Sequence, residues 1–243
     1  MIHAQTYDAA TTSVIWSPGQ DYVVLGRGEE YNTKRTIVDG KTGRPLATLP
    51  DAWNLIAIAP DGRYILASQH RTSGFSVFSA SGQQTKTLTP RANVTSMRLT
   101  PQGDKALVGL ADGSVEVFRT SDWTPVHVLD GHRTEVIDID VSADGTLAYC
   151  VSHDARLFVW ELTGFRNIYR LNLDPEVVWV VPDPRQEQVF TISTSGIMDA
   201  RPLGSLAPHQ LSDAYLKPLV CKIPRAIRKE TPTTVRCDEA ATR

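Results

Sequence analysis

Residues 131–161 read GHRTEVIDIDVSADGTLAYCVSHDARLFVWE. Within this segment, a run rich in Val and Ile at 136–141 leads through a polar turn at 142–145 into a second apolar run at 147–150, and a third run follows at 157–160. Short runs of β-branched and aromatic residues that are separated by Asp and Gly are typical of antiparallel strands. The segment therefore predicts a small β-sheet.

The same pattern occurs five times along the chain at an even period, although the fifth copy is degraded. The equivalent turn positions are separated by 42, 41, 42 and 41 residues, and they are Pro18, Pro60, Pro101, Ala143 and Pro184. An α-solenoid would need apolar residues at i, i+3 and i+4 over longer stretches, and a β-sandwich would show no such period. Because the copies continue with a third and a fourth apolar run, we predict an all-β fold, a β-propeller of about five four-stranded blades.

The number of copies leaves the closure of the ring open. Five blades lie at the low end of the roughly four to eight that close a propeller. A small closed ring, an open arc with exposed edge strands and a fragment of a longer chain all fit, and residues 1–7 could supply a closing strand. We expect the propeller to span residues 1–207 and a basic tail without the repeat to span 208–243.

Residues 131–161 resemble one blade of the WD-repeat family. The family marks a blade by Gly-His, a later turn Asp and a closing Trp-Asp; here Asp154 follows His132 by 22 residues and Trp160 follows Asp154 by six. The resemblance implies that Asp154 lies in a tight turn between the second and third strands and bonds His132. It also implies that Trp160 closes the third strand.

The sequence departs from the family pattern at two positions of this blade. Cys150 stands where the family has a small hydroxyl residue, and a thiol is only a weak donor and acceptor. Glu161 replaces the Asp that follows the Trp. The resemblance therefore covers residues 8–203 as a pattern of WD-like blades and one blade as a motif. The hairpin DGKTGRPL at 39–46 resembles those of bacterial WD-repeat proteins.

The composition excludes several classes of protein. With 41% hydrophobic and 21% charged residues, the chain has the composition of an ordinary globular protein. Its formal net charge of -2 provides no general attraction to nucleic acid or to an anionic membrane surface. No apolar run is long enough to span a bilayer, the first residues lack the features of a signal peptide, and the three cysteines are scattered. We expect a cytoplasmic protein with free thiols.

No motif in the sequence indicates catalysis or a cofactor. His132, His153 and Asp154 are possible metal ligands, but the resemblance already uses two of them in a structural network. The Asp residues within 138–144 lack the spacing of a calcium loop, and the Gly-rich turn at 26–28 does not open a helix. We therefore expect no catalytic residue, no metal and no cofactor, and we do not expect an enzyme.

The loops at the two ends of the propeller are the surface left for function, because the apolar faces of the blades are used in packing. The resemblance implies that partners dock on the end that carries the turn Asp. The repeat alignment places at that end the candidate partner-binding residues Trp53, His70, Arg71, Arg133 and His153. Aromatic and Arg side chains are frequent anchors of protein interfaces.

Our leading hypothesis is a non-catalytic scaffold that binds a protein or peptide through these loops. Nucleic acid, membrane and small-molecule ligands are not expected. Two alternatives remain: a regulatory or sensor propeller within a larger bacterial signalling protein, and a propeller enzyme with its site in the central channel. The tail at 208–243, with seven Lys and Arg against four Asp and Glu, is either a docking arm or a solvated extension.

Overall fold

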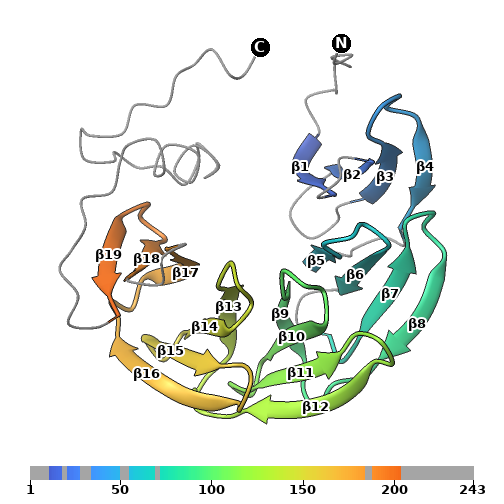
Figure 1. Ribbon diagram of the computed structural model, residues 1–243. Helices are drawn as coiled ribbons and strands as arrows, with labels where there is room; N and C mark the ends of the chain where they lie inside the picture. Colours follow the sequence, from blue (N-terminus) through green and yellow to red (C-terminus); the bar gives the residue numbers. More distant parts are fainter. Residues whose placement is uncertain are drawn as a thin grey trace.

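The computed structural model describes residues 11–17, 21–27, 34–49, 55–68, 72–183 and 188–203. Within these ranges the regular structure consists of nineteen β-strands in five antiparallel sheets (Figure 1). These ranges contain no helix that could cross a membrane. The expectation of an all-β fold is confirmed.

Each sheet is a meander in which consecutive strands pair in chain order. Blade 1 contains β1 (Thr11–Trp16), β2 (Tyr22–Arg27), β3 (Lys34–Asp39) and β4 (Pro45–Thr48). Blade 2 contains β5 (Leu55–Ile58), β6 (Tyr64–Ser68), β7 (Phe75–Ser79) and β8 (Gln84–Leu88). Blade 3 contains β9 (Val94–Leu99), β10 (Lys105–Leu110), β11 (Val115–Arg119) and β12 (Thr124–Leu129). Blade 4 contains β13 (Val136–Val141), β14 (Leu147–Ser152), β15 (Arg156–Glu161) and β16 (Arg166–Asn172), and blade 5 contains β17 (Val177–Pro182), β18 (Gln188–Ser193) and β19 (Met198–Pro202).

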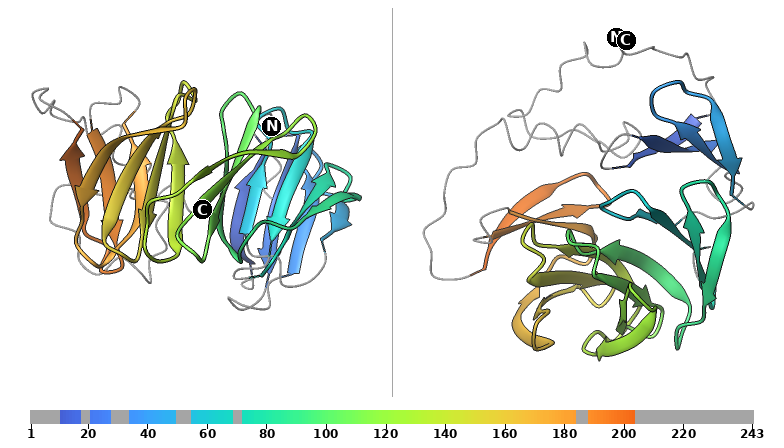
Figure 2. Two further views of the ribbon diagram at one scale, coloured as in Figure 1. Left: turned by 90° about the horizontal axis from the view of Figure 1, so that it is seen from below. Right: turned by 45° about the vertical axis from the view of Figure 1, so that its right-hand side comes forward.

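The five sheets stand side by side in an arc (Figure 1). The first strand of each blade lies on the concave side and the last strand lies at the periphery, and Figure 2 shows the sheets stacked face to face. Contacts between the first strands of blades 2, 3, 4 and 5 follow this order, since β9 contacts β5 and β13, and β13 contacts β17. Blades 1 and 5 lie on the two sides of the opening of the arc (Figure 1). The architecture of about five propeller blades is confirmed; residues 1–7 and 208–243 lie outside the described residues.

The even period of the sequence is the period of the blades. Second strands begin at Tyr22, Tyr64, Lys105, Leu147 and Gln188, which are separated by 42, 41, 42 and 41 residues. In every blade the backbone N–H at the end of the first strand donates to the carbonyl five residues later at 2.9–3.0 Å, the donors being Ser17, Ala59, Thr100, Ser142 and Asp183. The same hydrogen bond therefore recurs in all five blades, and the described turns of blades 2, 3 and 4 each contain a Gly with positive φ, at Gly62, Gly103 and Gly145.

Apolar clusters fill the spaces between neighbouring blades. One cluster joins Leu66 and Phe75 of blade 2 to Val108 and Phe118 of blade 3, and similar clusters join the other neighbouring pairs. Central strands that lie between two other blades are consequently buried on both faces, as in β14, whereas the peripheral β8 is almost fully exposed. A strand that is buried on both faces needs an uninterrupted apolar run, which is the pattern of the sequence.

Gly113 lies in the turn between β10 and β11 and packs closely against the loop that precedes β13. Its φ of +89° lies in the left-handed region, and a Cβ added there would lie 2.5 Å from the His132 carbonyl oxygen and 2.8 Å from that of Thr134. Gly62 has a similar φ of +72°, but its added Cβ would meet only a Tyr22 ring carbon at 3.7 Å.

We expect Gly113→Ala to destabilise the chain by about 2 to 4 kcal/mol, because left-handed strain and a clash with backbone atoms act together. Gly62→Ala is the matched control, and strain alone should cost it about 1 to 2 kcal/mol. Urea denaturation of the two variants measures the difference. Equal losses would show that the loop before blade 4 moves away without cost.

Candidate functional site

The loop that precedes β13 is fixed to the turn between β14 and β15 by a buried pair of side chains. His132 Nδ1 lies 3.0 Å from Asp154 Oδ1, and His132 Nε2 lies 3.1 Å from the Cys150 carbonyl oxygen. Asp154 Oδ2 accepts the backbone N–H of Arg133 at 3.0 Å. Only 2% of the His132 side chain and 6% of the Asp154 side chain are exposed. The structure thus brings together His132, Cys150 and Asp154, three of the four residues of the expected network.

The contact from Cys150 comes from its backbone and not from its thiol. A carbonyl group is available whatever the side chain, so the loss of the family's hydroxyl residue leaves this contact in place. The free thiol is completely buried, and burial raises its pKa above the usual range. A thiol that stays protonated and inaccessible is not a nucleophile.

An aromatic ring packs against the buried pair of His132 and Asp154. The His132 ring stacks on Phe158 with centroids 4.3 Å apart, and the Arg170 guanidinium carbon lies 5.0 Å from the Phe158 centroid. Trp160 follows on the same strand, with its ring 6.4 Å from that of Phe158. A Cβ added at Gly131 would lie 2.2 Å from Phe158, so the Gly before His132 leaves room for this ring. Sequence reasoning did not assign Phe158 to the network.

The protonation of His132 is set by two opposing effects. Burial lowers the pKa of His132 below its ordinary value, and the carboxylate of Asp154 opposes this effect. Both ring nitrogens face acceptors, and a neutral imidazole has one N–H to donate. Since the pair is enclosed, it cannot meet a substrate, and its role is to hold two loops together.

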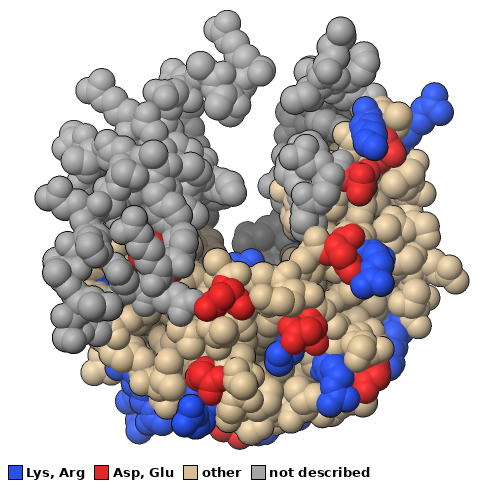
Figure 3. Space-filling model, viewed as in Figure 1, with Lys and Arg blue, Asp and Glu red and all other residues tan. Residues whose placement is uncertain are grey.

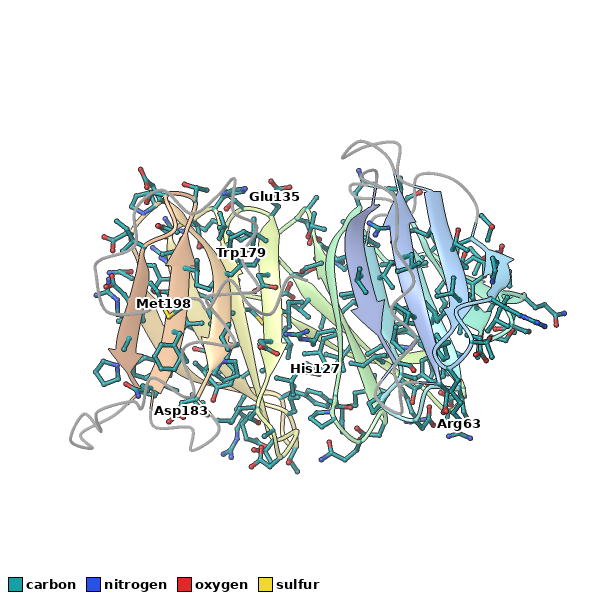
Figure 4. The ribbon with its side chains drawn as sticks, turned by 90° about the horizontal axis from the view of Figure 1, so that it is seen from above. Arg63, His127, Glu135, Trp179, Asp183 and Met198 are labelled. Carbon is teal, nitrogen blue, oxygen red and sulfur yellow. The ribbon has the colours of Figure 1, made fainter. Side chains whose placement is uncertain are left out.

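Arg133 and His153 flank this pair at the same end of blade 4. His153 is 50% exposed and its Nε2 lies 3.3 Å from Glu135 Oε1. Figure 4 places Glu135 at the end of the molecule opposite Arg63 and Asp183. The Arg133 residue is exposed, and its guanidinium forms no ion pair within the part of the chain that the structure describes. The other three candidate residues, Trp53, His70 and Arg71, lie outside the described residues.

Blade 3 has an ion pair at the position of the buried pair of blade 4. Arg91 Nε lies 3.0 Å from Asp112 Oδ2, with exposed side-chain fractions of 47% and 33%. Arg91 Nη1 also lies 3.7 Å from Asp130 Oδ1. An exposed pair of this kind contributes little to stability. The two blades therefore differ in how firmly the loops of this end are held.

A second carboxylate, that of the half-buried Asp138, lies between blades 4 and 5. Asp138 Oδ2 accepts the backbone N–H of Val180 at 3.0 Å, and burial raises the pKa of Asp138 to about 7. The charge of Arg98 lowers this pKa and that of Asp140 raises it, and these two residues form their own ion pair. Among the residues that the structure describes, no three His, Cys, Asp or Glu side chains form a group that could hold a metal ion.

Comparison with known proteins connects these observations to the WD repeat. Residues 123–161 match the family described as WD domain, G-beta repeat. The β-propeller domain of Cps50 (Swd1) from Myceliophteria thermophila superimposes with a TM-score of 0.67 at 15% identity, over 87% of this chain and 71% of that domain. This similarity concerns the fold.

The similar curated proteins are eukaryotic. Pre-mRNA-processing factor 19 of Schizosaccharomyces pombe is 24% identical over 144 residues, which are 58% of this chain and 29% of that protein. NACHT domain- and WD repeat-containing protein 1 of Mus musculus is 43% identical over 56 residues, 23% of this chain and 4% of that protein. The chain spans less than a third of the length of these relatives. They do not support the bacterial type that the hairpin at 39–46 suggested. The chain is a β-propeller in which the segment around β13 to β15 is similar to a WD repeat.

We expect Asp154→Ala to lower the free energy of unfolding by about 1 to 3 kcal/mol, because a buried imidazole and a backbone N–H lose their acceptor. The control is Arg91→Ala, which breaks the exposed ion pair at the equivalent position of blade 3 and should cost less than about 1 kcal/mol. Urea midpoints give the comparison. An unchanged midpoint for Asp154→Ala would contradict a stabilising role for the pair.

Asp138 should make stability depend on pH. Its carboxyl group has a higher pKa in the folded chain than in the unfolded one, so its contribution to the free energy of unfolding is present at acid pH and is lost as pH rises toward about 7. Asp138→Asn keeps an acceptor for the Val180 N–H and removes the titration. Denaturation at pH 5 and pH 8 should show a smaller decrease for the variant than for the natural chain, and identical decreases would rule out this linkage.

Proposed function

We propose that the chain is a non-catalytic protein-interaction module that binds a protein or peptide at the end of the propeller bearing Arg133 and His153. The observation that carries the proposal is the bond from the Arg133 backbone N–H to Asp154, at 3.0 Å. It holds the backbone of an exposed loop while leaving the guanidinium of that loop open to a partner. Guanidinium groups are frequent anchors of protein interfaces.

Preorganisation supports this choice of surface. The loops around His132 and the turn at Asp154 are joined by a buried pair, so a partner would bind them without a large loss of ordering entropy. Trp53, His70 and Arg71 belong to the proposed surface by the repeat alignment alone. The similarity to WD-repeat proteins also favours a binding role over catalysis. The cytoplasmic location, the role of the tail and a sensor role within a larger chain stay predictions.

The proposal is tested with a partner recovered by affinity capture from the source cells. Arg133→Ala and Trp53→Ala should each weaken binding of that partner about tenfold, the effect of losing about 1.4 kcal/mol at an interface anchor. Arg63→Ala is the matched control, since it removes an Arg that is 83% exposed at the opposite end (Figure 4). Dissociation constants are measured by titration calorimetry on variants whose unfolding midpoints are unchanged.

A truncation separates the loops from the tail. A chain ending at Leu206 should bind the partner as the full chain does. If this truncation abolishes binding while both loop variants bind normally, the tail is the docking element and the proposed surface is wrong.

A further inference from the structure

A groove on the concave side of the arc is lined by four consecutive blades. Its volume is about 430 Å³, and its walls include Ile15 of β1, Ile56 and Ile58 of β5, Met97 and Arg98 of β9, and Asp140 of β13. Figure 3 shows the arc hollowed on this side. The volume falls within the roughly 300 to 1,000 Å³ that is typical of ligand sites.

The walls of the groove include several apolar residues that are only half-buried. Ile15, Ile56, Ile58 and Met97 pack at the edges of the clusters between blades, and each keeps part of its side chain accessible. Inner apolar residues elsewhere, such as Val94 of β9, are completely buried. Contiguous accessible apolar surface in a concave site is a mark of an interaction site.

The two residues of the ion pair in the groove differ in how much of each side chain is exposed. Arg98 Nη2 lies 2.6 Å from Asp140 Oδ1, and 45% of the Arg98 side chain is exposed against 17% of that of Asp140. The same Asp140 oxygen also accepts the Val141 backbone N–H at 2.7 Å. The carboxylate is therefore shielded and already engaged. Arg98 is the more exposed member of the pair, and its guanidinium has five N–H donors, so the charged group that a ligand meets first in the groove is a cation with N–H donors to spare.

We propose that this groove binds an extended peptide segment of a partner protein in which an acidic residue is flanked by apolar residues. The carboxylate of the segment pairs with the open N–H groups of Arg98, and its apolar side chains pack against Ile56, Ile58 and Met97. Charge complementarity selects this occupant, because a basic segment would meet the exposed guanidinium first. The inference rests on the proposed function only in taking a protein segment as ligand. It concerns a different surface from that of Arg133.

The probe is a fluorescein-labelled peptide, Gly-Leu-Glu-Leu-Gly, compared with peptides that carry Gln or Lys in place of Glu. Fluorescence anisotropy should show that the Glu peptide binds the natural chain at least tenfold more tightly than either of the others. Arg98→Gln should remove the preference for Glu over Gln, and Arg98→Lys should keep part of it. Asp140→Asn should not weaken binding of the Glu peptide.

Controls keep the result interpretable. Arg133→Ala should leave binding of the peptide unchanged, so that failure of the groove and failure of the proposed partner surface are distinguishable. Unfolding midpoints establish that each variant is folded. If Arg98→Gln does not fold, Arg98→Lys and Ile56→Ser are used for the test. Ile56→Ser should weaken binding of the Glu peptide and of the Gln peptide by the same factor. The proposal is overturned if the Glu peptide does not bind at millimolar concentration, if the Glu and Gln peptides bind the natural chain equally, or if the Lys peptide binds best and loses affinity in Asp140→Asn.

Discussion

The structure depends on the burial of both faces of the central strands in blades 2, 3 and 4. A strand such as β14, in which Ala148 to Ser152 are all buried, would be exposed to water on both faces in an isolated sheet. Neighbouring blades supply the cover on both sides, and the clusters between blades contain residues from each of the two sheets. Stability is therefore a property of adjacent pairs of blades, as in other repeat architectures.

Polar groups fix how neighbouring blades sit against one another. Thr95 Oγ1 of β9 donates to the Val136 carbonyl oxygen of β13 at 2.6 Å, and Asp138 of β13 accepts from the backbone of β17. Such bonds are directional, whereas apolar contacts tolerate sliding. Since an unmade bond of a buried polar group is costly, these contacts favour one relative position of the blades. The pair of His132 and Asp154 has the same role for the loops at one end.

Apolar clusters and buried polar bonds hold the blades together, and the two proposed binding surfaces lie outside these contacts. The loops around Arg133 and His153 project from a scaffold that is held by buried bonds, and they present charged groups. The groove on the concave side presents apolar walls and one accessible guanidinium. On the two proposals made above, the arc binds different segments of a partner at a polar surface and at a partly apolar groove.

The sequence alone determined the features that depend on neighbours along the chain. The all-β class and the period follow from alternating runs and turns, and consecutive strands do pair within each sheet. The approach of His132 to Asp154 was predicted through the resemblance of residues 131–161 to a WD-repeat blade, and the structure shows this contact. Tertiary structure alone decided the features that join different blades. In β13, Asp138 accepts the Val180 N–H of blade 5, while Asp140, two residues further on, pairs with Arg98 of blade 3. The groove, too, exists only where four blades meet, and no local pattern encodes such a junction.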